Sequence, residues 1–160
     1  MAAKKDLHDL QDLIKYYFAS PDILEEALTR RASRSDLQLS LHENMDPLAT
    51  LGDAVLDVVV VHRLYEKGIR EKGKLTELKS NQTNREKTLA FAKKHQLQKY
   101  VHWGKGEDKN EVSTKGLKAL DTVTEALIGA VYLDAQKRGC NGITVVREML
   151  ERMDFFDSKK

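Results

Sequence analysis

The stretch PLATLGDAVLDVVVVHRLYEK, residues 47–67, is the most apolar part of the chain and decides its fold class. Its β-branched centre, taken alone, is compatible with a buried strand. The apolar run, however, reaches about 20 residues, whereas strands typically have about 4–8, and no turn residue interrupts it before Gly68. We therefore predict one long central helix that is apolar on nearly every side and that is also suited to cross a subunit interface.

Helical spacing of apolar residues continues through the rest of the chain. It predicts further helices over 6–18, from Pro21 through ILEEALTRR, and over 75–82, 84–95, 116–136 and 141–153. Two polar stretches, 32–46 and 101–114, are predicted to be loops. Because no convincing strand remains, we predict an all-α protein with a single domain over residues 1–160.

The composition limits the class of protein. Hydrophobic residues make up 41% and charged residues 32% of the chain, which is typical of a globular protein and not of a disordered one. There is no run of apolar residues long enough to span a membrane and no apolar signal core at the N-terminus. We therefore expect a cytoplasmic protein that does not engage a membrane. The single cysteine, Cys140, excludes an internal disulfide.

Two carboxylates lie in apolar surroundings. Asp53 follows Gly52 in the long helix, and Glu125 lies within TVTEALIGAVYL, one turn before Gly129. A buried carboxylate is costly unless it is paired or binds a cation, and a helical glycine permits close approach of another helix. The two helices are therefore candidates to pack together and to hold Mg²⁺, which usually takes one or two protein carboxylates. The alternative, in which Asp53 caps a turn and Glu125 pairs with a lysine, remains open because the two residues are 72 positions apart.

A set of motifs in a fixed order carries a family resemblance. The motifs are SPDILEEALTRRAS, LGDAVLD, LTELKSNQTNREKTLAFAKKHQL, YVHWGKGEDK and ALDTVTEALIGAVYLDA. The third of them includes an N-x-x-x-L-A helix that begins at Asn84. On these motifs the chain resembles the ribonuclease III catalytic (endonuclease) domain over most of its length.

The resemblance implies an all-α homodimer that hydrolyses double-stranded RNA endonucleolytically. It also implies dependence on Mg²⁺, with Mn²⁺ as a substitute, and products with 5′-phosphate and 3′-hydroxyl ends. By analogy the role is in RNA processing or maturation, including that of ribosomal RNA precursors. Carried over by motif, Asp53 and Glu125 are the metal-binding and catalytic residues. Asp46 is expected to be an outer acidic group, Asn84 to support the neighbouring loop and helix, and Thr122 to turn its hydroxyl toward a metal-bound water.

Three positions depart from the family pattern N-E-R-L-E-F-L-G-D and D-x-x-E. Ala49 stands where the family has its second glutamate, Thr50 where it has an aromatic that contacts the partner subunit, and Thr122 where it has an aspartate. Asp121 is one residue away from that last position, about 100° around a helix. The Mini-ribonuclease III branch is similar at two of these positions, since it has alanine at the first and threonine at the last. The chain therefore resembles a minimal form with a two-carboxylate site.

Basic residues are spread over the segment 67–118, which is compatible with a solvated surface or with a polyanion-binding one. The candidates for phosphate contacts, which would read the shape of the duplex, are Lys79, Lys105, Lys109, Lys115 and Lys118. From its length we expect the chain to lack the usual C-terminal double-stranded RNA-binding domain, and therefore expect weak, salt-sensitive binding, or help from a separate RNA-binding protein.

Two other hypotheses remain open from the sequence. The lost carboxylates are compatible with a catalytically inactive ribonuclease III-like dimer that binds structured RNA or a ribonucleoprotein. The composition alone is also compatible with an all-α interaction module unrelated to RNA.

Overall fold

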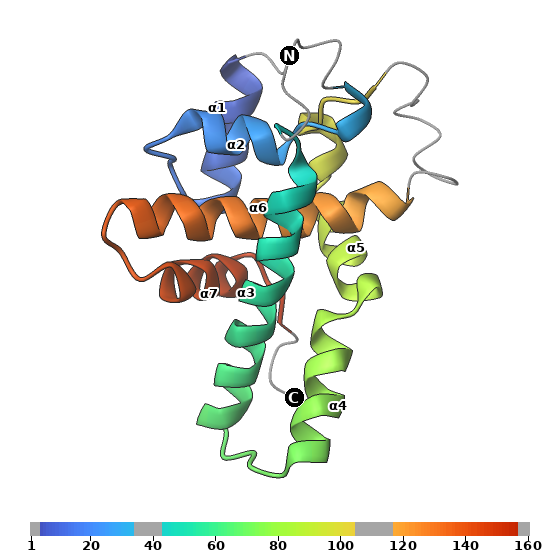
Figure 1. Cartoon of the computed structure of the whole chain (residues 1–160), viewed down its shortest axis with the longest axis vertical. Coiled ribbons are helices and arrows are strands. Elements are labelled where there is room, and N and C mark those ends of the chain that lie inside the picture. Colours follow the sequence, from blue (N-terminus) through green and yellow to red (C-terminus); the bar gives the residue numbers. More distant parts are fainter. Residues whose placement is uncertain (1–3, 34–42, 105–116, 157–160) are drawn as a thin grey trace.

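The computed structural model describes residues 4–33, 43–104 and 117–156, and in this part of the chain it is helical (Figure 1). The elements are α1 (Lys4–Ile14), α2 (Pro21–Ala27), a 3₁₀ turn η1 (Arg31–Ser33), α3 (Met45–Glu66), α4 (Lys72–Thr83), α5 (Arg85–Lys94), a second 3₁₀ turn η2 (Leu97–Tyr100), α6 (Leu117–Lys137) and α7 (Gly142–Arg152). Within these residues β pairing is limited to an isolated bridge between Thr29 and His102. The all-α prediction is confirmed.

The predicted central helix is α3, and local chemistry explains where it begins and ends. Asn44 caps its start, because its side chain accepts a hydrogen bond of 3.0 Å from the backbone N–H of Asp46. At the other end Gly68 adopts φ +85°, and Ile69 donates its N–H to the carbonyl of Leu64, which is the glycine-terminated Schellman arrangement. Despite the 22 residues of α3, no described helix is long and apolar enough to cross a membrane.

The most extensive helix–helix contact is between α3 and α6, which cross in Figure 1 near the upper part of α3. Two glycines make this crossing possible. A Cβ atom on Gly52 would lie 1.7 Å from the carbonyl oxygen of Glu125, and one on Gly129 would lie 2.1 Å from that of Leu48. The two backbones are therefore in direct contact, as the helical Gly129 led us to expect.

The remaining helices surround this crossing. In Figure 1, α4 runs back beside the lower half of α3, while α7 lies below α6 and α2 lies above it. Several predicted bounds shift by a few residues: the first helix ends at Ile14 and not at residue 18, since Lys15 takes a positive φ of 55°. The helix predicted over 75–82 is α4, which begins at Lys72, so Gly73 is helical and does not border a loop. Most of the predicted loops 32–46 and 101–114 lies outside the described residues.

A carboxylate that the sequence analysis overlooked fastens the connection between α1 and α2 to α6. Asp134 is fully buried, and it accepts hydrogen bonds from the hydroxyl of Tyr16 at 2.6 Å and from the backbone N–H groups of Ala19 and Ser20 at 3.1 and 2.9 Å. Burial opposes ionisation, but these hydrogen bonds outweigh it and lower the pKa of Asp134. Arg138 also lies 3.6 Å from this carboxylate. The role of Asp134 is therefore structural.

The glycine crossing gives a direct stability prediction. Gly52→Ala places a methyl group against the backbone of α6, so we expect a loss of about 3 kcal/mol or more in the free energy of unfolding. Gly73→Ala, in the exposed helix α4, meets only the flexible side chain of Glu71 and is the matched control. We expect it to be neutral or to stabilise by up to about 1 kcal/mol. Denaturant unfolding of both variants measures the contrast, and equal stabilities would contradict the crossing.

Candidate active site

Asp53 lies in the middle of α3, immediately after the glycine that touches α6, and its side chain is exposed. It is therefore far from either helix end, which rules out the alternative that it caps a turn. Because Gly52 abuts the backbone of Glu125, the two carboxylates that the sequence separates by 72 positions lie beside each other. The helix crossing is what assembles the site.

Glu125 projects from α6 at this crossing and is half-buried. Burial raises the pKa of Glu125 to about 7, and the negative charges of Asp53 and Asp121 contribute to the rise. Among the described residues no lysine forms an ion pair with Glu125, so the second alternative from the sequence finds no support there. In this part of the chain the site concentrates negative charge without a basic partner for Glu125, which is a common property of functional sites.

Asp121 is a residue whose place the sequence analysis did not foresee. It precedes Glu125 by four residues, so the two share a face of α6 even though Asp121 is offset from the family's usual aspartate position. Its carboxylate forms an ion pair of 2.9 Å with Arg85 of α5 and accepts a hydrogen bond of 2.9 Å from the N–H of Thr122. The i, i+4 spacing from Glu125 is a signal that could have revealed it.

Asp46 and Ala49 lie toward the start of α3, one turn apart, and differ in their burial. Asp46 is exposed on the same face as Asp53, but seven residues earlier, which is roughly 10 Å along the helix axis. That separation suits an outer group better than a ligand shared with Asp53. Ala49 is only 6% exposed and belongs to the apolar core, so the residue at the lost acidic position now packs inside. Thr50 is exposed, and its hydroxyl donates to the carbonyl of Asp46 at 3.3 Å.

Asn84 holds the junction between α4 and α5. Its side chain accepts a hydrogen bond of 3.1 Å from the N–H of Lys87 and so caps α5. That helix is fixed to α6 farther along, where the buried hydroxyl of Thr124 donates to the carbonyl of Thr88 at 2.8 Å. Asn84 thus orders the helix that carries Arg85, the partner of Asp121, and this placement is compatible with the predicted supporting role.

Among the five candidate lysines, the structure describes the side chain of Lys79 only. Its ammonium group lies 3.2 Å from the carboxylate of Asp57, so α4 is joined to α3 by this ion pair. Lys105, Lys109 and Lys115 fall outside the described residues, and Lys118 lies in the first turn of α6 with a side chain outside them as well. Their phosphate contacts remain predictions.

The carboxylates at the crossing suit a small divalent cation. Carboxylate oxygens are ligands that Mg²⁺ prefers, two protein carboxylates are a common number for it, and a cation would offset the repulsion that contributes to the raised pKa of Glu125. The described residues do contain a separate group of three closely spaced ligand atoms, from His8, Asp9 and Asp12, but it lies on α1 and not at the crossing. The crossing therefore offers two carboxylates that could hold such a cation.

Comparison with known sequences places this arrangement in a protein family. Residues 46–136, more than half of the chain, match the family described as Ribonuclease III domain. The chain belongs to this family. The matched segment contains Asp46, Asp53, Asn84, Thr122 and Glu125, and so spans the whole candidate site.

Individual relatives agree with this assignment. The chain is 32% identical over 146 residues to Ribonuclease 3 of a Nitratiruptor species and 31% identical over 150 residues to Ribonuclease 3 of Campylobacter curvus. These alignments cover 91% and 93% of this chain but 59% and 61% of the relatives, so the chain spans about three fifths of their length.

Solved structures show the same fold. The nuclease domain of ribonuclease III from Campylobacter jejuni superposes with a TM-score of 0.78 at 25% identity, covering 100% of both chains. A second structure of that domain superposes with a TM-score of 0.77 at 26% identity, covering 92% of this chain and 94% of the other. That second structure is described as showing structural flexibility in a region involved in dimer formation of the Campylobacter domain.

The raised pKa of Glu125 predicts how the stability of the metal-free protein depends on pH. Its pKa is about 7 in the folded state against about 4.5 when unfolded, so the folded state binds more protons between these values and loses stability as the pH rises through them. Glu125→Gln removes this penalty. We expect the Glu125→Gln variant without metal to have a free energy of unfolding about 1–2 kcal/mol higher than that of wild type at pH 8, a value that allows for solvent screening. At pH 4.5 we expect no such gain.

Denaturant unfolding at several pH values in the presence of a chelator measures this effect. Glu148→Gln, which makes the same chemical change at an exposed position of α7, is the matched control. A difference between Glu125→Gln and wild type that stays constant with pH would contradict the raised pKa.

Proposed function

We propose that this protein is a Mg²⁺-dependent endoribonuclease of the ribonuclease III type that hydrolyses double-stranded RNA and leaves 5′-phosphate and 3′-hydroxyl ends. The observation that carries the proposal is the placement of Asp53 beside Glu125 at the crossing of α3 and α6, inside the segment that matches the family. A role in RNA processing or maturation, including that of ribosomal RNA, and a cytoplasmic location are part of the proposal.

Asp53 and Glu125 are the residues that would hold the cation. When bound there, Mg²⁺, or Mn²⁺ in its place, supplies neutralisation of phosphate charge and a water molecule that ionises more readily. Asp53 contributes an exposed carboxylate. Glu125 contributes a carboxylate that, with a pKa near 7, gives up its proton when positive charge arrives. The two residues thus combine binding of the cation with storage of a proton at the Glu125 carboxylate.

The residues around this pair would position it. Arg85 holds Asp121, so the third negative charge near Glu125 stays in place without becoming a ligand. Thr122, in the next position of α6, is partly exposed and can turn its hydroxyl toward water at the site. Asp46 would act from about two turns away as an outer acid, and the basic residues Lys79, Lys105, Lys109, Lys115 and Lys118 would contact phosphates.

The proposed acting form is a homodimer on duplex RNA, because two sites that face one duplex give two cuts. A separate RNA-binding protein is proposed as an additional partner.

A second function is favoured by one observation: Ala49 is apolar and buried where the family carries an acid, so the site has fewer ligands than usual. On that hypothesis the chain is an inactive dimer that binds structured RNA or a ribonucleoprotein.

Cleavage of long duplex RNA with Mg²⁺ tests the proposal. We expect the wild-type protein to cleave, and Asp53→Asn and Glu125→Gln each to lower the rate by at least about 100-fold, because each removes one of two acidic ligands. Asp9→Asn on α1 and Glu148→Gln on α7 make the same chemical changes at exposed positions away from the crossing and should leave the rate unchanged.

The outcomes separate the two functions. Cleavage that survives both substitutions at the crossing would refute the proposed site. Duplex binding by the wild-type protein without cleavage, with either Mg²⁺ or Mn²⁺ supplied, would favour the inactive RNA-binding dimer. If the protein neither binds nor cleaves duplex RNA, the remaining hypothesis is an all-α interaction module unrelated to RNA.

A further inference from the structure

Three carboxylates lie near one another where α3 crosses α6. The negative charges of Asp53 and Asp121 both contribute to the raised pKa of Glu125. Asp121 precedes Glu125 by four residues, so the two side chains are neighbours on one face of α6. A third acidic group is therefore within reach of a cation held by Asp53 and Glu125.

The carboxylate of Asp121 differs from that of Glu125 because the protein itself holds it at both oxygens. Its Oδ2 atom lies 2.9 Å from Nε of Arg85, and its Oδ1 atom accepts a hydrogen bond of 2.9 Å from the backbone N–H of Thr122. Burial and two neighbouring charges account for the raised pKa of Glu125, and no hydrogen bond from the described residues contributes to it. Asp121 is thus restrained, whereas Glu125 is available to a ligand.

The packing of α5 against α6 determines where the guanidinium group of Arg85 lies. The hydroxyl of Thr124 donates to the carbonyl of Thr88 at 2.8 Å, and both of these residues are fully buried. Arg85 and Asp121 each lie three residues before this contact, so the same packing places the base opposite the acid.

The position of Arg85 in α5 is unusual for a base. It is the first residue of the helix, where the helix dipole favours acidic side chains and disfavours basic ones. Its side chain is 51% exposed, and ion pairs that solvent can reach contribute little to stability. The fold gains little from a base at this position, so its effect on the neighbouring carboxylate is the more informative property.

We propose that Arg85 is a positioning residue that keeps Asp121 away from the cation and thereby limits the cation affinity of the site; the inference rests on the cation site proposed above. With Arg85 in place, two carboxylates face the cation and the guanidinium group neutralises the third. Without Arg85, the carboxylate of Asp121 keeps only its hydrogen bond to Thr122, which leaves one oxygen for the cation. A third acidic ligand adds negative charge and a donor atom, so the cation binds more tightly.

The place of Asp121 in the sequence gives this restraint its meaning. Thr122 stands where the family has an aspartate, and Asp121 projects from α6 about 100° away from that position. The site therefore lacks an acid at one position of α6 and restrains an acid at the position before it. Both features reduce the number of carboxylates that face the cation.

Calorimetric titration of the full chain with Mn²⁺ tests the restraint. We expect Arg85→Gln, which removes the positive charge but keeps a long polar side chain, to lower the dissociation constant at least about fivefold. Arg85→Lys keeps a base beside Asp121 and should stay within about twofold of wild type. The double variant Arg85→Gln/Asp121→Asn should bind no more tightly than Asp121→Asn alone. Arg152→Gln, which makes the same chemical change at the exposed last residue of α7, should leave the dissociation constant unchanged.

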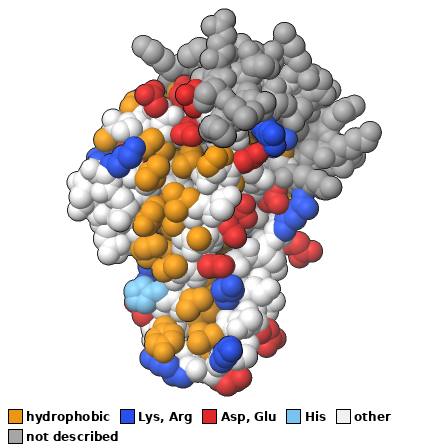
Figure 2. All heavy atoms as spheres, in the orientation of Figure 1, with side chains coloured by type: hydrophobic (Ala, Val, Ile, Leu, Met, Phe, Trp, Pro, Cys, Tyr) orange, Lys and Arg blue, Asp and Glu red, His pale blue; other side chains and the backbone are white. Residues whose placement is uncertain are grey.

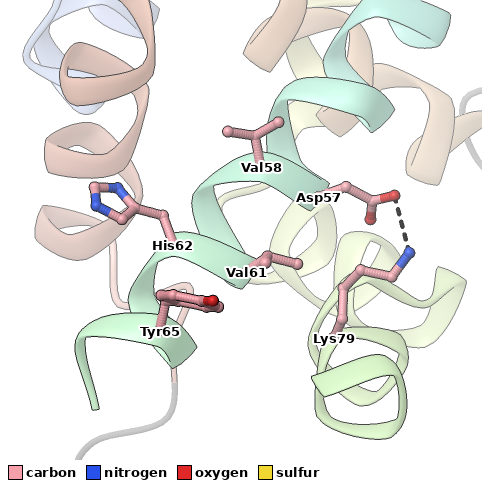
Figure 3. A pocket seen from close by; sticks show the side chains of 6 residues that line it. All are labelled: Asp57, Val58, Val61, His62, Tyr65 and Lys79. Atoms are coloured by element: carbon pink, nitrogen blue, oxygen red, sulfur yellow. Dashed lines mark hydrogen bonds and ion pairs between the residues drawn. The ribbon is translucent and has the colours of Figure 1, made fainter. Parts of the chain in front are cut away.

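A second control separates the contact of Arg85 from its charge, because an acid beside a base is common on this surface. Figure 2 shows acidic and basic side chains next to each other at several places. One such pair, Asp57 with Lys79 at 3.2 Å, joins α3 to α4 one turn after Asp53 (Figure 3). Asp57 is not among the charges that raise the pKa of Glu125, so Lys79→Gln should change the Mn²⁺ dissociation constant by less than about twofold.

The outcomes separate this inference from the proposed function. If wild type binds Mn²⁺ and Arg85→Gln leaves the dissociation constant unchanged, the inference is overturned while the cation site stands. Equal tightening by Arg85→Gln with and without Asp121→Asn would also overturn it, because Arg85 would then act through its charge alone. Absence of Mn²⁺ binding in wild type and in Arg85→Gln, or binding that survives Asp53→Asn, would refute the cation site and the inference with it. Circular dichroism checks that each variant is helical, and Arg85→Met replaces Arg85→Gln if that variant unfolds.

Discussion

The contact between the backbones of α3 and α6 at Gly52 and Gly129 is the constraint on which the rest of this structure depends. With a Cβ atom at either position the helices would have to separate, since such an atom would lie about 2 Å from a carbonyl oxygen of the other helix. The same contact buries the apolar centre of the protein and places Asp53 next to Glu125. Folding and assembly of the site are therefore one event.

The electrostatic consequence of this contact is unfavourable for the protein without a ligand. Glu125 loses solvent and faces two other carboxylates, which raises its pKa to about 7. Elsewhere the chain treats a buried acid differently: Asp134 receives a hydroxyl and two backbone N–H groups, and its pKa is lowered. Asp134 therefore stabilises the fold, whereas Glu125 lacks such hydrogen bonds and is suited to bind a cation or a proton.

Three sides of α3 serve three purposes. One side, which includes Leu56, Val59 and Val60, is buried in the core. Another carries Asp46 and Asp53, and the third carries exposed apolar side chains, among them Val58 and Tyr65. A helix used in this way must be apolar around most of its circumference, which explains why its sequence shows no clear amphipathic pattern and resembles a buried strand when only DVVVV is considered.

The sequence by itself determined the all-α class, the approximate bounds of the helices and the family, because these depend on periodicity, capping residues and motifs that are local in the chain. Gly68 marks the end of α3 from its chemistry alone, whereas the cap at Asn44 was seen only in the structure. The sequence also singled out Asp53 and Glu125, as acids in apolar runs, but it did not place them together. Only the tertiary structure decided that pairing, the nearness of Asp121 and the burial of Ala49, because each depends on how α3 and α6 are turned toward each other. It likewise decided which apolar side chains of α3 enter the core and which remain exposed, since local periodicity does not distinguish a helix that is buried all round from one that has an exposed apolar side.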